Sequence, residues 1–352
     1  MDPAQPVPDR IDPETFFTRP DIFPVEFGQG HIQFVPMTRE SYGRSLFTDR
    51  GRIVPAATHG WQVPTGQVLA EFERRGIPQP RLFFIFHIAH CGSTLLARAV
   101  DVPGRTLVIR EPFALRQLAV DAVAANVASD PVTRERCLHL ATALLGRRYA
   151  EDQPVIVKAN VPVNFILQPL MALHPESRGI LLYADLDDYL LSVLKTPIHR
   201  RWVMNVSGQL ADAIRATPGL EDTNLTALDA PQTAACLWIA QLNRFHRAIA
   251  ECDRLKSLNC RDLFGRPAET LREAMKLAGA PVTPSEAQAI AEGDLFRRHA
   301  KDPRRKFDRS ARARQMARLA EEMAPELEAA RSWAASMPAW KRVTAPMKRP
   351  LL

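Results

Sequence analysis

The sequence lacks paired cysteines. Its five cysteines are scattered, and no two of them form a C-x-x-C pair; they are Cys91, Cys137, Cys236, Cys252 and Cys260. An odd and scattered set argues against a disulfide framework and against a zinc site of the usual spacing. We therefore expect neither disulfides nor a bound metal.

Long hydrophobic runs are also missing. Residues 1–24 are rich in proline and aspartate and contain no apolar segment of the kind found in signal peptides. No apolar run elsewhere approaches the length of a membrane span. These absences predict a soluble protein of the cytoplasm. With 352 residues and an ordinary content of charged residues, the chain is long enough to bury a large core.

The net charge of +7 is concentrated near the end of the chain. Residues 301–314 contain seven lysines and arginines against two aspartates. A surface for nucleic acid is expected to spread its positive charge more widely. We therefore expect no nucleic-acid partner.

Strand-like and helix-like segments alternate through the middle of the chain, which predicts an α/β fold: a parallel sheet with helices on both faces. The expected strands are residues 81–86, 106–110, 154–158, 179–183 and 255–259. The expected helices are residues 93–100, 113–129, 132–150, 163–173, 187–194, 232–253 and 268–277.

The two ends of the chain differ from this middle part. Residues 1–78 contain several prolines and the alternating run HIQFVPM, and we expect an N-terminal extension or cap there. Residues 79–308 would form the α/β core. Residues 309–352 would add a long helix over 310–335 and a basic tail. The chain shows no internal repeat or low-complexity tract.

The most informative segment is RLFFIFHIAHCGSTLLARAV, residues 81–100. An apolar run breaks at a His-Cys-Gly turn and resumes as an amphipathic helix, which predicts a strand, a tight loop and a helix start. Backbone N–H groups around Gly92, Ser93 and Thr94 would converge there, and the helix dipole would favour an anion. We therefore expect a ligand that carries phosphate or a similar group.

This loop departs from the Walker pattern G-x-x-x-x-G-K-[ST]. His87 stands at the first glycine and Ser93 stands at the lysine. Without the lysine, the loop lacks the usual contact to the β- and γ-phosphates. No clear Mg²⁺-binding aspartate follows an apolar strand either. A P-loop kinase or other NTPase is therefore a weak alternative.

The run His90-Cys91-Gly92-Ser93-Thr94 resembles the phosphosulfate loop of the sulfotransferase superfamily. Later segments resemble further parts of that family in the family's order: TLVIREP at 106–112, PVIVKANVPVNF at 154–165, HPESRGILLYADLDDYLLSVLK at 174–195 and LKSLNCRDLFGRPAETLREAMKLAG at 255–279. The resemblance covers about residues 81–307. It implies a P-loop-type, three-layer fold.

The resemblance also implies an activity. The family transfers a sulfonate group from 3′-phosphoadenosine 5′-phosphosulfate (PAPS) to a hydroxyl or amine, here of a small-molecule, lipid or sugar acceptor. Residues 90–94 would then hold the phosphosulfate, and Ser192 would contact the 3′-phosphate. The sequence indicates neither the acceptor nor the oligomeric state.

Two basic positions of the family are altered in this chain. His90 stands where an arginine or lysine is common, and Ala184 stands where the family's arginine contacts the 3′-phosphate. Asp185 and Asp187 would repel a phosphate unless they turn away. The candidate substitutes are Lys195, Arg200 or Arg201, and the late basic segment with Arg304, Arg305 and Lys306. That segment has an alternative interpretation as the solvated flank of a helix.

Three residues are the candidates for catalysis. His90 would supply a cation if bound phosphates raise its pKa, or a neutral N–H donor otherwise. Glu111 follows a strand at the edge where such sheets bind ligands, and it is our preferred general base. Its alternative roles are a helix cap or a partner for Arg110. Lys158 would reach the phosphosulfate or the acceptor, and its alternative is an exposed lysine at a strand end.

Two further residues of the loop are interpreted as structural. His87 is expected to be satisfied by backbone groups, and Cys91, which has no identifiable triad partner, is expected to fill space in the loop. The altered positions His90 and Ala184 leave a second functional hypothesis open, namely a repurposed or non-catalytic nucleotide-binding protein of the same fold.

Overall fold

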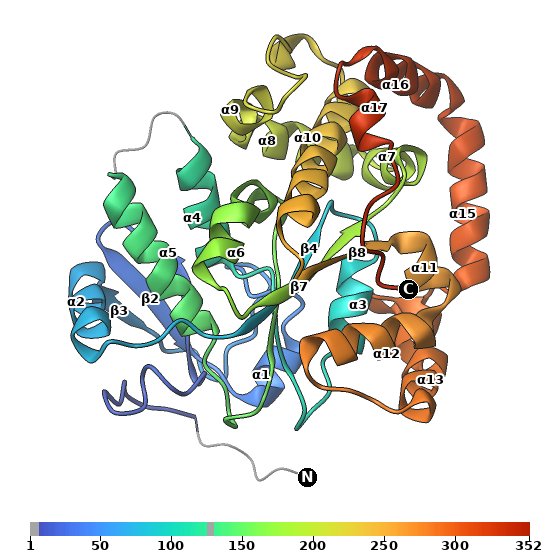
Figure 1. Ribbon diagram of the computed structural model, residues 1–352. Coiled ribbons are helices and arrows are strands. Elements are labelled where there is room, and N and C mark those ends of the chain that lie inside the picture. Colours follow the sequence, from blue (N-terminus) through green and yellow to red (C-terminus); the bar gives the residue numbers. More distant parts are fainter. Residues whose placement is uncertain (1–6, 125–129) are drawn as a thin grey trace.

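A five-stranded parallel sheet forms the centre of the molecule in this computed structural model, which describes residues 7–124 and 130–352 (Figure 1). The strands are β4 (Leu82–His87), β5 (Leu107–Arg110), β6 (Val155–Lys158), β7 (Arg178–Tyr183) and β8 (Leu255–Asn259). Their order is β5-β6-β4-β7-β8, and every neighbouring pair is parallel. The predicted fold class is therefore confirmed, with each predicted strand within one residue of its observed bounds.

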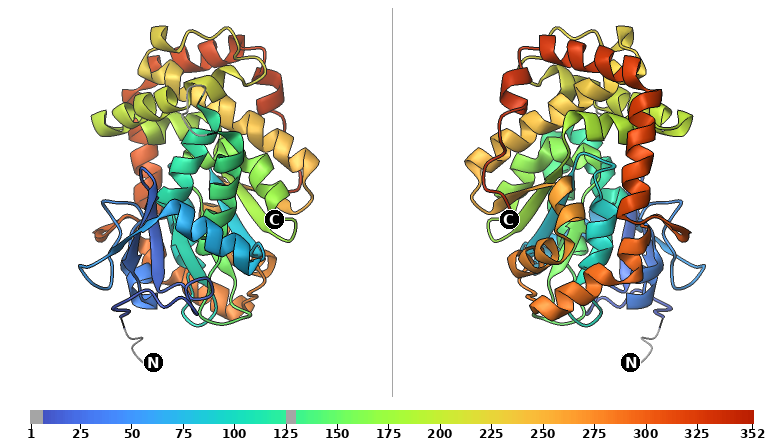
Figure 2. Two further views of the ribbon diagram at one scale, coloured as in Figure 1. Left: turned by 90° about the vertical axis from the view of Figure 1, so that its left-hand side faces the viewer. Right: turned by 90° about the vertical axis from the view of Figure 1, so that its right-hand side faces the viewer.

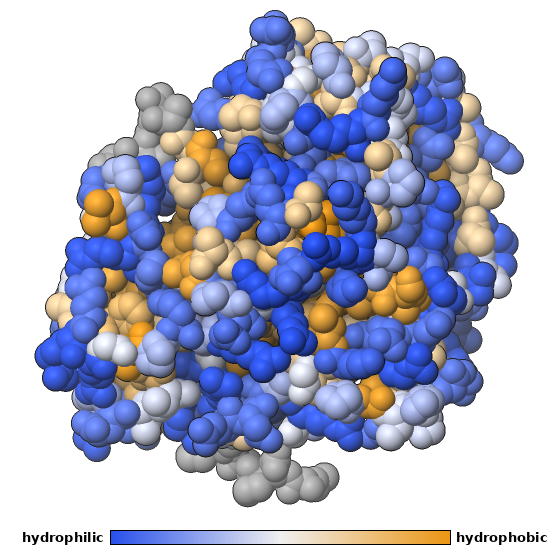
Figure 3. Space-filling view, viewed as in Figure 1, coloured by the Kyte–Doolittle hydropathy of each residue, from blue (hydrophilic) through white to orange (hydrophobic). Residues whose placement is uncertain are grey.

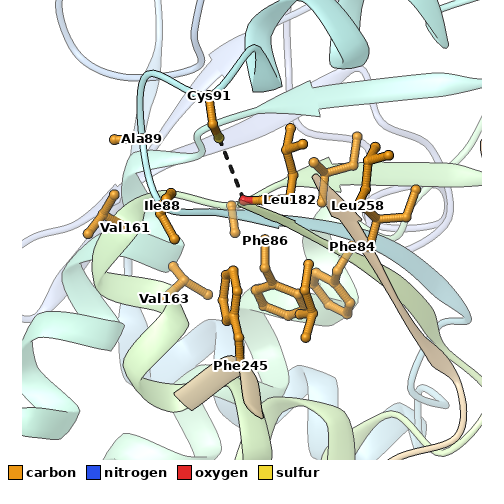
Figure 4. Close-up of a cluster of buried hydrophobic side chains, with 14 of the residues drawn as sticks. Phe84, Phe86, Ile88, Ala89, Cys91, Val161, Val163, Leu182, Phe245 and Leu258 are labelled. Atoms are coloured by element: carbon orange, nitrogen blue, oxygen red, sulfur yellow. Dashed lines mark hydrogen bonds between the residues drawn. The ribbon is translucent and has the colours of Figure 1, made fainter. Parts of the chain in front are cut away.

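Helices cover both faces of this sheet. One face carries α3 (Ser93–Ala99), α11 (Cys260–Gly265) and α12 (Pro267–Ala278), and the other carries the 3-10 helix η1 (Val161–Ile166), α6 (Leu167–Leu173) and α10 (Ala230–Glu251). Phe84 and Phe86 are stacked with ring centroids 5.3 Å apart, and they point toward Val163 of η1 and Phe245 of α10 (Figure 4). Because both faces are covered, all six residues of β4 are buried.

The N-terminal region forms a second, antiparallel sheet of β1 (Ile22–Phe27), β2 (His31–Pro36) and β3 (Trp61–Pro64), with helices α1 (Arg39–Arg44) and α2 (Thr65–Arg75). The alternating run noted above is β2, in which buried and more exposed residues alternate. Two buried arginines join this region to the rest of the chain. Arg147 donates to the carbonyl oxygens of Phe16, at 2.6 Å, and Ile22, and Arg110 donates to that of Ser45 at 3.1 Å.

Two helices between β5 and β6 are shorter than predicted. The helix predicted over 113–129 is α4 (Phe113–Val123), and residues 125–129 lie outside the described part of the chain. The helix predicted over 132–150 is α5 (Pro131–Leu145). It ends at Gly146, where a side chain would collide with Pro80, because a Cβ there would lie 2.2 Å from the Pro80 Cγ.

The helix predicted over 310–335 is also wrong, because two helices occupy this range: α15 (Arg309–Glu322) and α16 (Ala324–Ser336). Pro325 lacks an N–H, and its ring excludes a helical carbonyl four residues earlier, so a continuous helix cannot pass through Met323. Figure 2 shows α15 running along the side of the molecule and α16 crossing its top.

The remaining elements lie mostly around the carboxyl ends of the parallel strands. They are α7 (Leu186–Leu194), α8 (Pro197–Gln209), α9 (Ala211–Arg215), η2 (Leu225–Ala227), α13 (Pro284–Glu292), α14 (Asp294–Arg297), α17 (Trp340–Val343) and the two-stranded pair β9 (Arg298–His299) and β10 (Asp302–Lys306). The late basic segment, residues 301–314, consists of β10 followed by the first turns of α15. In the described parts of the chain, no helix is long and apolar enough to cross a membrane.

Candidate functional site

A cavity of about 1280 Å³ opens at the carboxyl ends of the parallel strands. The chain leaves β4 for β5 and β6 on one side and later returns to β7 and β8 on the other side. Open α/β sheets bind ligands in the crevice at this reversal of strand order. The space-filling view shows a mostly polar outer face with small apolar patches (Figure 3).

The loop after β4 has an unusual backbone. Ala89, His90 and Gly92 have φ angles of 72°, 52° and 89°, all in the left-handed region. Residues in such conformations turn successive N–H groups toward one side, which creates a concavity for an anion. Ser93 and Thr94 begin α3 directly after this turn, and both line the cavity. The structure thus forms the loop that the sequence predicts between a strand and a helix.

The Cys91 side chain lies on the far side of this loop, away from the cavity. Its thiol is directed at the carbonyl oxygen of Leu182, 3.6 Å away, and the side chain joins the core beneath the loop (Figure 4). Burial raises the pKa of Cys91 to about 11. The thiol is therefore protonated at neutral pH, and Cys91 presents no nucleophile to the cavity.

His90 belongs to this loop, and its side chain packs against helix α8. Its ring makes edge contacts with His199, at 4.7 Å between centroids, and with Trp202, at 5.5 Å. Burial lowers the pKa of His90 well below its usual value, and the positive charge of Lys301 adds to this effect. The imidazole is therefore neutral at neutral pH, which favours the neutral N–H donor over the cation.

Lys158 and Glu111 form a buried pair at the ends of β6 and β5. The Lys158 ammonium is fully buried and contacts the Glu111 carboxylate, the Nε2 atom of His87 at 3.1 Å, and the face of the Phe47 ring. The alternative interpretation of Lys158, as a solvent-exposed lysine at a strand end, is therefore wrong. Glu111 does not pair with Arg110, which instead forms an ion pair of 2.9 Å with Asp101.

His87 belongs to the same cluster. Its Nδ1 accepts the N–H of Ala89 at 3.0 Å, so the imidazole connects Lys158 to the loop after β4. Burial lowers the pKa of His87 well below its usual value, and the charge of Lys158 lowers it further. The contact with the Ala89 N–H agrees with the prediction that backbone groups satisfy His87, whereas the contact with Lys158 was not predicted. The position of His87 beside two charged strand ends in a parallel sheet was the signal that could have revealed it.

Lys301 is a second residue for which the sequence indicated no role. It lines the cavity from the turn between β9 and β10, and its ammonium lies 5.7 Å from the centre of the Phe47 ring. Its charge contributes to the lowered pKa values of His87, His90 and Lys158. The loop, Glu111 and Lys301 thus line one cavity, and Lys158 is buried beneath Glu111.

Three solved structures match this fold. The sulfotransferase domain of the curacin biosynthetic pathway is 14% identical, with a TM-score of 0.41 over 70% of this chain and 98% of that chain. A protein from Alicyclobacillus acidocaldarius is 14% identical, with a TM-score of 0.36 over 72% and 98% of the two chains. One from Mycobacterium avium is 14% identical, with a TM-score of 0.37 over 73% and 81%. All three are sulfotransferases. No protein-family model and no curated protein matches the sequence.

Only some of the residues that the sequence predicted at the 3′-phosphate line the cavity. Ser192 and Lys195 line it, whereas Arg304 and Lys306 do not. Arg304 is exposed and pairs with Asp302 at 3.2 Å, and the side chain of Arg305 lies outside the described part of the structure. Two other arginines of the same basic segment, Arg309 and Arg312, line the cavity instead.

The acidic residues beside Ala184 turn away from this cavity. Asp185 pairs with Arg261 at 2.8 Å, and Asp187 pairs with Arg331 at 2.8 Å. Both line a smaller cavity of about 690 Å³ behind β7. Asp185 and Asp187 therefore do not repel a phosphate in the larger cavity, which the sequence analysis had considered. In residues 7–124 and 130–352, no three His, Cys, Asp or Glu side chains gather as they would around a metal ion.

Proposed function

We propose that this protein is a PAPS-dependent sulfotransferase that moves a sulfonate group to an acceptor hydroxyl. The observation that carries the proposal is that Glu111, paired with the buried Lys158, lines the same cavity as the loop with its left-handed backbone. This pair offers a base next to the position where an anion would be held.

The lining of the cavity suits a nucleotide with two anionic ends. The backbone of the loop at residues 90–94 and the Lys301 ammonium would hold the phosphosulfate. Ser192, Lys195 and Arg312 would hold the 3′-phosphate in place of the arginine that Ala184 replaces. Arg312 already stacks on the Phe264 ring at 3.9 Å, so its guanidinium is positioned beside the cavity.

The size of the cavity leaves room for an acceptor as well. Pockets that bury one drug-sized ligand measure roughly 300–1,000 Å³. The volume here, about 1280 Å³, exceeds that range. A donor and an acceptor can therefore occupy it together, as an in-line transfer requires.

In the reaction, PAPS supplies an activated sulfonate. Glu111 accepts the proton of the acceptor hydroxyl while the bond from the acceptor oxygen to sulfur forms and the bond from sulfur to the bridging oxygen of the 5′-phosphate breaks. The bridging oxygen keeps the electron pair, and Glu111 later releases its proton to water. Lys301, which lines the cavity, stabilises the negative charge that develops on the sulfonate and on this oxygen, and the buried Lys158 holds the Glu111 carboxylate in place.

A second candidate function is nucleotide binding without transfer. The neutral state of His90 favours it, because this ring supplies no fixed charge where a basic residue is common. The two functions differ in whether Glu111 has an acceptor to deprotonate.

The test is calorimetric titration with 3′-phosphoadenosine 5′-phosphate (PAP), with 5′-ADP as the control ligand. We expect PAP to bind at least about tenfold more tightly than 5′-ADP, because only PAP carries the 3′-phosphate. Arg312→Gln should remove this preference, whereas the remote surface variant Arg247→Gln should retain it. Failure of both nucleotides to bind would refute the proposal, and PAP binding without transfer to any acceptor would support the second candidate.

A further inference from the structure

One end of the cavity is formed by the segment around Phe47 and by the start of α4. Thr48 accepts the N–H of Phe113 at 3.2 Å and donates its own N–H to Arg110 at 2.7 Å, which fixes this segment against the residues that flank Glu111. The Phe47 ring faces the ammonium groups of Lys158 and Lys301. This is the end at which an acceptor hydroxyl would meet Glu111.

Three arginines line this end of the cavity, and two of them are neutralised. Arg50 pairs with Glu26 and lies over the Phe113 ring, 4.7 Å from its centre. Arg52 pairs with Asp49 and lies over the Phe47 ring, 4.2 Å from its centre. Their charges are compensated by the protein itself.

Arg116 is the third arginine and differs from the other two. It lies on α4, one turn after Phe113, is half-buried and lines the cavity. Its guanidinium donates to the amide oxygen of Gln209, a neutral group. Among the ion pairs of the described residues, none joins Arg116 to a carboxylate. Burial lowers the pKa of Arg116, and the nearby charge of Glu111 opposes this shift.

A half-buried guanidinium without an anionic partner is stabilised when a ligand supplies one. Arginine binds carboxylates and phosphates through two parallel hydrogen bonds, which also fixes the orientation of the ligand. Phe47 and Phe113 add ring faces for an apolar ligand body at the same end. The geometry therefore suits a ligand with an anionic group at Arg116 and a hydroxyl at Glu111.

We propose that the acceptor is a hydroxylated organic anion whose carboxylate or phosphate group binds Arg116. This inference rests on the proposed sulfotransferase function and adds to it the class of the acceptor. Arg116 is a specificity residue, because it touches the acceptor at a distance from the reacting hydroxyl.

The test measures sulfonate transfer from PAPS by mass spectrometry with acceptors in charge-matched sets. Each set shares one hydroxylated frame: 4-hydroxyphenylpropionate with its amide, 12-hydroxydodecanoate with its amide, and glucuronate with glucuronamide. A fourth set compares 2-(4-hydroxyphenyl)ethyl phosphate with the corresponding alcohol, which separates phosphate from carboxylate. Wild type, Arg116→Gln and the remote control Arg247→Gln are compared after each is shown to bind PAP.

In at least one set we expect the anionic member to have a kcat/KM about tenfold or more above that of the neutral member. Arg116→Gln should remove this preference through a higher KM and leave the neutral member within about twofold. Preference for neutral members, equal loss for both members, or transfer to neutral members alone would overturn the inference. PAP binding without transfer to any member would instead support the second candidate function. Loss of PAP binding in the wild type would instead reject the proposed function itself.

Discussion

Glu111 has a backbone φ of 54°, a conformation that residues other than glycine rarely adopt. The strained turn directs its carboxylate back to Lys158, and the Lys158 side chain is completely buried. Replacing Glu111 by glutamine keeps the shape and removes the proton acceptor. We expect kcat for sulfonate transfer to fall by about 10²–10⁴-fold.

The affinity of this variant for PAP, measured by calorimetry, should stay within about twofold of wild type, because in the proposed function Glu111 contacts the acceptor and not the nucleotide. Circular dichroism confirms whether the variant folds with the uncompensated Lys158. A kcat within about fivefold of wild type would show that another group accepts the proton.

The paired histidines beside the loop predict how nucleotide binding depends on pH. Burial lowers the pKa of His199 to about 4 and holds that of His90 well below its usual value, so both rings are neutral in the free protein at neutral pH. A bound anion favours the protonated rings and raises their pKa values in the complex. The complex therefore takes up protons, and the affinity for PAP should fall as the pH rises from about 4 through the raised pKa values of the two rings in the complex.

Calorimetry in two buffers of different ionisation enthalpy measures this proton uptake. His199→Asn should lower the number of protons taken up, while His31→Asn, on the exposed end of β2, should leave it unchanged. Affinity that is independent of pH in the wild type would show that the two rings do not respond to the nucleotide.

The sequence predicted the position of a site residue only where that residue lies at the end of a predicted strand. Glu111 and Lys158 terminate predicted strands, and parallel strands bring such ends together. Lys301 could not be found in this way, because its place depends on how a distant segment folds over the cavity. The same reason explains why Arg309 and Arg312, and not Arg304 and Lys306, line it.

At the scale of elements, the turn from β4 to α3 requires a glycine. Gly92 has a φ of 89°, and a Cβ there would lie 2.9 Å from the Cζ of Phe264. We expect Gly92→Ala to lower the free energy of unfolding by about 1–3 kcal/mol, because an alanine is strained at this φ. PAP affinity should fall at least about tenfold, because the loop N–H groups lose their alignment.

Urea denaturation and calorimetry measure the two effects. Gly208→Ala in α8 is the matched control, because a Cβ there meets nothing within 4 Å and the helix should gain about 0.4–1 kcal/mol. The double variant Gly92→Ala with Phe264→Leu separates strain from collision. Full recovery of stability in the double variant would mean that the contact, and not the φ angle, requires glycine.

Elements with a strong local signal were predicted well, and their ends were predicted poorly. Four strands of the central sheet, β4, β5, β6 and β7, contain runs of three or more consecutive apolar residues, so their positions depend little on the rest of the fold. The break between α15 and α16 has a local cause, Pro325, that the composition of residues 310–335 conceals. The antiparallel N-terminal sheet was expected only as a cap, because the pairing of β2 with β3 joins segments far apart in sequence.

At the scale of the whole molecule, the structure raises the question of whether the N-terminal sheet and the central sheet unfold together. Arg147 lies at their junction, is 3% exposed, and donates to the carbonyl oxygens of Phe16 at 2.6 Å, Leu144 at 2.7 Å and Ile22. Burial lowers the pKa of Arg147 to about 10, so it remains charged at neutral pH. We propose that residues 7–78 and the core form one cooperative unit.

Arg147→Met keeps an apolar side chain but leaves these buried carbonyl groups without a donor, at about 1–3 kcal/mol for each. We expect the variant to lose several kcal/mol of stability, while Arg148→Met, at the neighbouring half-exposed arginine, should lose little.

Urea unfolding followed by fluorescence distinguishes the two sheets, because Trp61 is the one tryptophan of β3 and Trp61→Phe removes its signal. If the two regions are one unit, Arg147→Met shifts a single transition equally with and without Trp61. A transition that moves only when Trp61 is present would instead make the N-terminal sheet a separate domain, and the Phe47 segment that it carries could then leave the acceptor end of the cavity without unfolding the core.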